Sequence, residues 1–226
     1  MHATSITTAI LAGGAALRLG GRDKGLEPLN GRPLIGWIVD ALRTMDVGAA
    51  SASMLLSRQD DPERPASERT PADALDYGIL LIVANRNIDA YSQHATTISD
   101  DVAGFRGPLA GIASALAFCT TPWLMTVPVD CPRPPRNLAS RLVQAVQEGP
   151  ADAVVAHNGE RRQPLFAIYR RKLAGSAAQA AAMGQGVWSW QDAIGTRELD
   201  FSDCRRQFHN LNTPAEFAAY ADLDKT

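Results

Sequence analysis

The sequence predicts a single three-layer α/β/α domain in which helices cover both faces of a mostly parallel β-sheet. Three observations support this fold class. Short aliphatic runs typical of buried strands alternate along the chain with amphipathic segments of helical periodicity. Several of the helical segments begin at a proline, which favours the first turn of a helix. The length of 226 residues fits one domain spanning residues 1–226.

The first half of the chain is expected to form two strand–helix pairs separated by long loops. The run 7–12 predicts a buried strand, and the glycine-rich, charged stretch 13–31 that follows predicts a loop. Pro33 stands where a helix with apolar positions at helical spacing can begin. The aliphatic run 79–84 predicts a strand buried on both faces, and Gly107-Pro108 introduces a helix of small residues.

The second half is expected to add three strands and three helices. Apolar runs predict the strands at 123–129, 153–156 and 165–169. Apolar spacing and alanine content predict helices at 137–147 and 172–183. The last helix opens at Thr213-Pro214-Ala215-Glu216, a capping box with proline at the first helical position.

Residues 58–76 interrupt this alternation. The segment is polar, charged and contains three prolines, so it predicts an exposed or disordered insertion that carries no catalytic residue. The insertion leaves open whether the second strand of the sheet is 79–84 or an earlier run at 52–56.

Composition excludes several classes of protein. The chain has 22 basic and 24 acidic residues, a net charge of −2, which argues against binding nucleic acid through gross charge. The apolar run 79–84 is far shorter than the roughly 20 residues of a membrane helix, so no membrane span is expected. The N-terminus has no Lys or Arg before Arg18, unlike a secretory signal, so we expect a cytoplasmic protein. Three widely spaced cysteines predict neither a disulfide framework nor a thiolate zinc site.

The loop after the first predicted strand carries the clearest chemical pattern. Gly13-Gly14 is followed by Arg18 and by Asp23-Lys24. The spacing fits neither the Walker A loop nor the G-x-G-x-x-G dinucleotide motif. A glycine turn with a guanidinium and an ammonium on one loop can cradle a triphosphate, through bare backbone N–H groups and two positive charges. The alternative is a set of ordinary turns with solvated charges.

Polar residues also follow two later strands. Asp130 ends the run 123–129, where ligands of parallel sheets bind, and a lone carboxylate suits Mg²⁺. It could instead cap the next helix. Asn85 ends the run 79–84 and could either contact a nucleotide or satisfy a turn, and Asp100 could be an ordinary loop carboxylate. The four histidines have no metal-ligand spacing.

The run LAGGAALRLGGRDKGLEPLNGRPLI at 11–35 resembles the motif of the molybdenum cofactor guanylyltransferases, a branch of the nucleotidyltransferases. Further matching segments follow in the family's order over nearly the whole chain apart from the insertion: ANR at 84–86, SDD and GPLAG up to Gly111, VPVD at 127–130, QPLFAIYR at 163–170 and NLNTPAEF at 210–217. Gly13-Gly14 with Asp23-Lys24 is more similar to the guanylyl branch than to the cytidylyl branch. Leu19 stands where the family commonly has methionine, a change that conserves volume.

The resemblance implies a Rossmann-like nucleotidyltransferase fold and transfer of GMP from GTP to the terminal phosphate of molybdopterin, with Mg²⁺ as cofactor. Molybdoenzyme apoproteins or their chaperones are implied as further partners. The residues that match the family's site are Arg18, Lys24 and Asp130 as catalytic residues, Asp130 also as the metal ligand, Leu11, Ala12, Gly13, Gly14, Lys24, Asn85, Asp100 and Asp130 for the nucleotide, and Asn210 and Asn212 for metal or pterin.

Two other functions remain open on the sequence. One is a related nucleotidyltransferase, which would transfer a cytidylyl group to molybdopterin or a nucleotidyl group to a sugar phosphate. The other is a regulatory protein that binds nucleotide without catalysis. Comparing stabilisation by GTP, CTP, UTP and ATP separates the first, and pyrophosphate release separates the second.

Overall fold

The computed structural model describes residues 6–13, 22–45, 79–100 and 107–223. The elements in chain order are β1 (Ile6–Leu11), η2 (Lys24–Leu26), β2 (Pro28–Leu29), β3 (Arg32–Pro33), α1 (Leu34–Arg43), β4 (Leu80–Val83), α3 (Ile88–Ser92), β5 (Thr96–Ile98), α4 (Pro108–Phe118), β6 (Trp123–Pro128), α5 (Leu138–Gln147), β7 (Ala153–His157), β8 (Arg162–Arg170), η4 (Arg171–Leu173), α6 (Ala174–Ala182), α7 (Val187–Ala193), β9 (Arg197–Asp200), η5 (Ser202–Phe208) and α8 (Pro214–Leu223).

Seven strands form the main sheet in the order β5-β4-β1-β6-β8-β7-β9. All neighbouring pairs are parallel except those made by β8, which runs antiparallel to both β6 and β7. The predicted three-layer α/β/α class with a mostly parallel sheet is therefore confirmed. The chain runs outward from β1 through β4 to β5 and then returns to place β6 on the other side of β1. This reversal is a topological switch point, where ligands of open α/β sheets bind.

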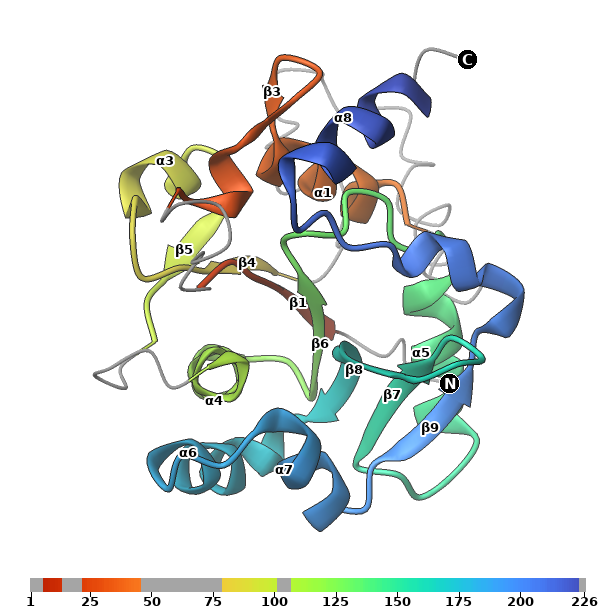
Figure 1. Ribbon diagram of the computed structural model, residues 1–226. Coiled ribbons are helices and arrows are strands. Elements are labelled where there is room, and N and C mark those ends of the chain that lie inside the picture. The colour runs from red at the N-terminus through yellow and green to blue at the C-terminus, as the bar shows by residue number, and fades with distance from the viewer. Residues whose placement is uncertain (1–5, 14–21, 46–78, 101–106, 224–226) are drawn as a thin grey trace, which may run out of the picture.

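Helices cover both faces of the sheet (Figure 1). One face packs on α1 and α5, with fully buried side chains such as Ile35 and Leu142 in the first core cluster. The other face packs on α4, α6 and α7, with Leu116 and Trp190 in the second. Two cores divided by a sheet are the consequence of strands that are apolar on both faces, as the continuous aliphatic runs predict.

Most of the expected elements lie close to their predicted limits. The alanine-rich segment predicted as one helix at 172–183 instead begins with the short turn η4 before α6. The strand expected at 165–169 is longer, because β8 extends from Arg162 to Arg170 as the second strand of a hairpin with β7. The run 79–84 forms β4 next to β1. The insertion 58–76 and the alternative strand at 52–56 lie outside the described residues.

Within the described part of the chain, no helix has the length and apolarity needed to cross a bilayer.

Candidate active site

The ends of β1 and β6 bring two of the predicted segments together. The two strands pair in parallel with Leu11 opposite Pro128. The Val129 N–H donates to the Leu11 carbonyl at 3.1 Å, which extends the pairing by one residue before Asp130. Gly13 and Asp130 therefore leave the sheet at the same edge, at the switch point. This edge is where the sequence places the triphosphate cradle and the magnesium carboxylate.

Lys24 connects the glycine loop to two distant segments. Its Nζ donates to Asp130 Oδ2 at 3.0 Å and to Asn212 Oδ1 at 2.8 Å. The side chains of Lys24 and Asp130 are 21% and 17% exposed, so the ion pair is only partly screened by water. The fold thus gathers an ammonium, a carboxylate and an amide from three parts of the chain that the sequence singles out separately.

Asp130 does not cap the following helix, which was the alternative interpretation. α5 begins at Leu138 with Asn137 as its N-cap residue. The backbone carbonyl of Asp130 accepts from the Leu211 N–H at 2.8 Å, which ties the C-terminal segment to the end of β6. The side chain is left to face Lys24, at the edge of the sheet.

One oxygen of Asp130 fits a cation ligand. Oδ1 is buried and has no hydrogen-bond partner among the described residues, while Oδ2 accepts from Lys24. The described residues contain no group of three or more His, Cys, Asp or Glu side chains that could hold a metal. A single available carboxylate oxygen is the donor set that Mg²⁺ uses when substrate phosphates and water complete its shell. The residues present therefore fit a magnesium ion that binds together with a nucleotide.

Asn210 and Asn212 lie on the C-terminal segment that returns to this edge. The Asn212 N–H donates to Glu216 Oε2 at 2.6 Å, and its Nδ2 donates to the Asn210 carbonyl at 3.2 Å. The side-chain oxygen of Asn210 is buried without a partner in the described residues. Glu216 and Thr213 form the predicted capping box, with Glu216 N donating to Thr213 Oγ1 at 3.3 Å. The capping box thus also orders the loop that presents Asn212 to Lys24.

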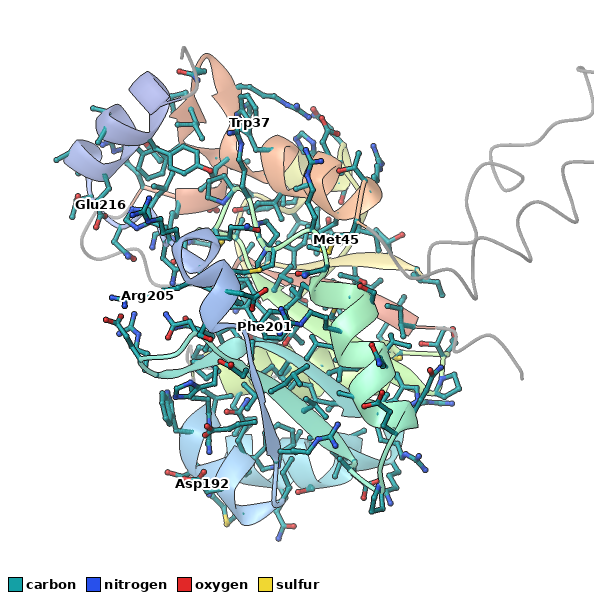
Figure 2. All side chains as sticks on the ribbon, turned by 90° about the vertical axis from the view of Figure 1, so that its right-hand side faces the viewer. Trp37, Met45, Asp192, Phe201, Arg205 and Glu216 are labelled. Carbon is teal, nitrogen blue, oxygen red and sulfur yellow. The ribbon has the colours of Figure 1, made fainter. Side chains whose placement is uncertain are left out.

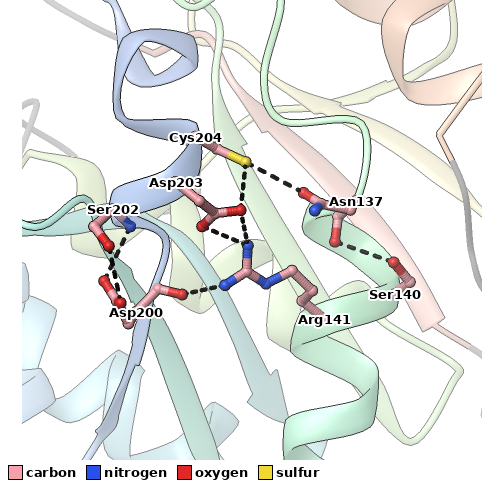
Figure 3. A network of polar contacts seen from close by, with 7 residues as sticks. All are labelled: Asn137, Ser140, Arg141, Asp200, Ser202, Asp203 and Cys204. Atoms are coloured by element: carbon pink, nitrogen blue, oxygen red, sulfur yellow. Dashed lines mark hydrogen bonds and ion pairs between the residues drawn. The ribbon is translucent and has the colours of Figure 1, made fainter.

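The same C-terminal segment is anchored further upstream by Arg141 of α5 (Figure 3). Its Nη1 donates to both carboxylate oxygens of Asp203, at 2.9 and 3.0 Å, and its guanidinium lies 4.0 Å from the centre of the Phe201 ring. The hydrogen bonds from Arg141 hold the pKa of the Asp203 carboxyl below the usual range of an aspartate. Phe201 lies inside the molecule while Arg205 lies at its surface (Figure 2). The buried Phe201 ring and the more exposed ion pair anchor the start of the path that leads to Asn210.

Asn85 and Asp100 form a second polar pair at the same edge. Asn85 Nδ2 donates to Asp100 Oδ2 at 2.7 Å, and the Asp100 N–H donates to Asn85 Oδ1 at 3.0 Å. A Cβ on Gly13 would lie 3.6 Å from Asn85 Nδ2 and 3.9 Å from Asp100 Oδ2. The glycine loop therefore leaves the sheet directly beside this pair. Asn85 uses its amide to order Asp100, as the interpretation of a residue that satisfies a turn expects, and its contact with a nucleotide stays a prediction.

The glycine loop itself is described only in part. Gly14 and Arg18 lie outside the described residues. The Ala12 N–H donates to the Val83 carbonyl at 2.8 Å, so this amide is used within the sheet. Backbone donors for a phosphate are thereby limited to positions after Ala12.

Three site-adjacent residues were missed by sequence reasoning. Tyr91 and Asn87 both donate to the carboxylate of Asp23, the residue before Lys24. Cys131, next to Asp130, is buried and donates to the Gln207 carbonyl, and burial raises the pKa of its thiol well above the usual range. A thiol held in this way is a poor nucleophile, so Cys131 is a packing residue.

Comparisons of the sequence with known proteins find a family and relatives of similar length. Residues 8–198 match the model of the MobA-like NTP transferase domain. The chain is 36% identical over 215 residues to the molybdenum cofactor guanylyltransferase of Vibrio cholerae, covering 95% of this chain and 90% of that protein.

Solved structures share the fold at lower identity. The molybdopterin-guanine dinucleotide biosynthesis protein A of Archaeoglobus fulgidus superposes with a TM-score of 0.69 at 19% identity, over 97% of this chain and 98% of that one. A Mycobacterium tuberculosis protein in complex with manganese superposes with a TM-score of 0.58 at 15% identity, over 91% and 98% of the two chains. The match of residues 8–198 and the Vibrio relative together establish that this chain belongs to the MobA-like NTP transferase family.

Proposed function

We propose that this nucleotidyltransferase transfers GMP from GTP to the terminal phosphate of molybdopterin, which gives molybdopterin guanine dinucleotide and pyrophosphate. The observation that carries the proposal is the convergence of Lys24 Nζ on Asp130 and Asn212 at the switch point of the sheet. Relatives 33 to 36% identical over nearly the whole chain are named molybdenum cofactor guanylyltransferases, which supports the choice of base and acceptor.

The reaction needs charge balance and alignment more than it needs a base. An oxygen of the acceptor phosphate attacks the α-phosphorus of GTP, and the bond from that phosphorus to the oxygen bridging the α- and β-phosphates breaks. The acceptor phosphate is ionised at neutral pH, so no group has to remove a proton from it. Charge builds on the leaving pyrophosphate, and fixed positive groups stabilise it.

We assign the charged groups of the site to this task. Lys24 and Arg18 bind the β- and γ-phosphates, and the backbone of Leu11, Ala12, Gly13 and Gly14 lies against the nucleotide, with Ala12 limited to its carbonyl. Asp130 would hold the cation through Oδ1. The cation, when bound, would supply positive charge to the phosphates. The Mycobacterium tuberculosis protein of this fold forms a complex with manganese, which supports a divalent cation, and we propose Mg²⁺ for this chain.

The polar pair of Asn85 and Asp100 is assigned to the nucleoside. An amide and a carboxylate side by side offer both a donor and acceptors, as a guanine edge or a ribose requires. Asn210 and Asn212 are assigned to the acceptor or the metal, because Asn212 contacts Lys24 and the Asn210 side-chain oxygen lacks a partner among the described residues. We also propose that the product passes to molybdoenzyme apoproteins or their chaperones.

The test compares nucleotides before it measures turnover. Thermal unfolding with GTP, CTP, UTP and ATP, each with Mg²⁺, reports which base the native state binds. We expect the largest stabilisation with GTP, and an equal or larger stabilisation with CTP would contradict the assignment of the base. Pyrophosphate release from GTP in the presence of molybdopterin then tests catalysis, and release that does not depend on molybdopterin would contradict the acceptor.

A further inference from the structure

Asp23, the residue before Lys24, is held by three donors of the protein itself. Tyr91 donates its hydroxyl to Asp23 Oδ1 at 2.5 Å, and the Gly25 N–H donates to the same oxygen at 3.3 Å. Asn87 Nδ2 donates to Oδ2 at 3.0 Å. Both oxygens of this carboxylate are therefore engaged within the protein, which is unlike Asp130 with its one unpartnered oxygen.

Tyr91 reaches Asp23 from the interior. The residue lies on α3, is 0% exposed and belongs to the first core cluster. Burial, together with the hydrogen bond to Asp23, raises the pKa of its hydroxyl well above the usual range, so it stays a donor. Its position is matched to Gly25, because a Cβ there would lie 2.3 Å from the Tyr91 hydroxyl oxygen and 2.8 Å from Val129 Cγ2. Only glycine lets the hydroxyl approach this closely.

The contact fixes the backbone from which Lys24 extends. Asp23 is the N-cap residue of η2, whose first residue is Lys24. Asn87 adopts a left-handed backbone with φ 52°, which turns the chain into α3 and also brings its amide to Asp23. A lysine side chain has many rotamers, so its Nζ reaches Asp130 and Asn212 reproducibly only if its backbone is fixed.

The link also joins the two halves of the site. The connection after β4 carries Asn85, which orders Asp100, and then Asn87 and Tyr91, which order Asp23. In Figure 1 the short helix η2, in orange-red, lies beside α3, in yellow. One short stretch of chain thus sets both the nucleoside pair and the lysine.

We propose that Asp23 and Tyr91 are positioning residues that act through Lys24, by fixing its backbone so that its ammonium meets the phosphates of the nucleotide. The inference rests on the proposed function, because it needs Lys24 to act on phosphates. The carboxylate of Asp23 itself does not bind the nucleotide or a cation. Loss of the contact then costs turnover more than affinity, since a misplaced ammonium stabilises the transition state less while most nucleotide contacts remain.

The first experiment pairs two buried tyrosines. Tyr91→Phe removes one hydrogen bond to Asp23 Oδ1 and leaves that from Gly25. Tyr169→Phe is the matched control, because Tyr169 is also 0% exposed and its hydroxyl also hydrogen-bonds to a side chain, as it accepts from Gln191 Nε2. When the Tyr169 hydroxyl is removed, Gln191 Nε2 keeps its bond to the Pro164 carbonyl. We expect Tyr91→Phe to lower kcat for GTP-dependent transfer about tenfold with KM for GTP changed less than about threefold, and Tyr169→Phe to change neither more than about twofold.

Two further variants separate positioning from a direct role. Asp23→Asn keeps an oxygen that accepts from Tyr91 and Gly25 and puts an NH2 group in place of Oδ2, to which Asn87 can present its side-chain oxygen after an amide flip, whereas Asp23→Ala removes both acceptors. We expect Asp23→Asn to retain most of the kcat that Asp23→Ala loses. Asn87→Gly allows the left-handed backbone, removes the side-chain amide donor and leaves the core intact. We expect it to lower kcat as Tyr91→Phe does, and it tests the inference even if Tyr91→Phe folds poorly.

The outcomes are distinguishable. If Tyr91→Phe and Asn87→Gly match Tyr169→Phe in kcat, the positioning role is wrong. If Asp23→Asn loses as much as Asp23→Ala, the carboxylate charge acts directly and the inference is also overturned. Lys24→Ala in the same assay tests the proposed function on which the inference rests. Full activity of that variant would refute the proposed site. An inactive Lys24→Ala together with a fully active Tyr91→Phe would refute only the positioning role.

Discussion

Lys24 and Asp130 are 106 positions apart in the chain, and their side chains form an ion pair at 3.0 Å. The pair links the loop after β1 to the end of β6, the two strands that flank the switch point. Lys24 bonds only to Oδ2 of the carboxylate, and Oδ1 has no hydrogen-bond partner among the described residues. Under the proposed function, Oδ1 is the oxygen that would hold the cation.

Lys24→Ala should lower turnover about 100-fold, because removal of a fixed charge at a developing anion has effects of this size. The fold should persist, because Asp130 and Asn212 are both partly exposed and can be hydrated. Steady-state pyrophosphate release measures the first effect and circular dichroism the second. Lys172→Ala is the control, since Lys172 pairs with Asp152 at 2.7 Å on the surface and is 60% exposed. A Lys24→Ala enzyme within about threefold of the parent rate would contradict the role.

Asp130→Asn should abolish the part of GTP stabilisation that depends on Mg²⁺. Asparagine is isosteric and still accepts from Lys24, but it lacks the charge that a hard cation requires. The measurement is the shift in melting temperature with GTP, with and without Mg²⁺, for the parent and the variant. Asp152→Asn, which changes a surface carboxylate paired with Lys172, should keep the full shift. An unchanged magnesium dependence in Asp130→Asn would place the cation elsewhere.

The Asn85–Asp100 pair should behave as one unit in nucleotide binding. Asp100→Ala removes the acceptor of Asn85 Nδ2 but keeps the bond from the residue 100 N–H to Asn85 Oδ1, whereas Asn85→Ala removes both hydrogen bonds that hold Asp100. Each change should weaken GTP binding about tenfold, and the double variant should be little worse than either single one, because each residue orders the other. Calorimetric titration with GTP provides the three affinities. Fully additive losses would show that the two residues contact the nucleotide independently.

How much of this site the sequence could predict depends on the kind of contact. Lys24 and Asp130 could be predicted because each follows a strand with an unmistakable apolar run, and parallel strands end at one edge. The contact between Asn212 and Lys24 could not be predicted, because the two residues are 188 positions apart and no regular strand leads into the segment that carries Asn212. The capping box predicted the start of α8 but not that it also orders Asn212.

The elements missed have weak local signals. α3 is five residues long, too short for helical periodicity, so the approach of Tyr91 to Asp23 could not be foreseen. β9, with the sequence Arg-Glu-Leu-Asp, shows no apolar run because it is the last strand of the sheet and its side chains are mostly exposed. The β2–β3 hairpin did have a signal: Asn30-Gly31, both at positive φ, is the turn that such hairpins favour.

Glu216→Gln should make stability less dependent on acid pH and loosen the Asn212 loop. Hydrogen bonds from the Asn212 and Thr213 N–H groups hold the pKa of the Glu216 carboxyl below its ordinary 4.5. A pKa that is lower in the folded state contributes stability that is complete above 4.5 and is lost as the pH falls through the folded value. The parent should therefore melt at a higher temperature than Glu216→Gln near neutral pH, and the gap should shrink as the pH falls below 4.5. Melting curves across this range measure the gap, and a gap that stays constant with pH would mean that the ionised carboxylate does not support the loop.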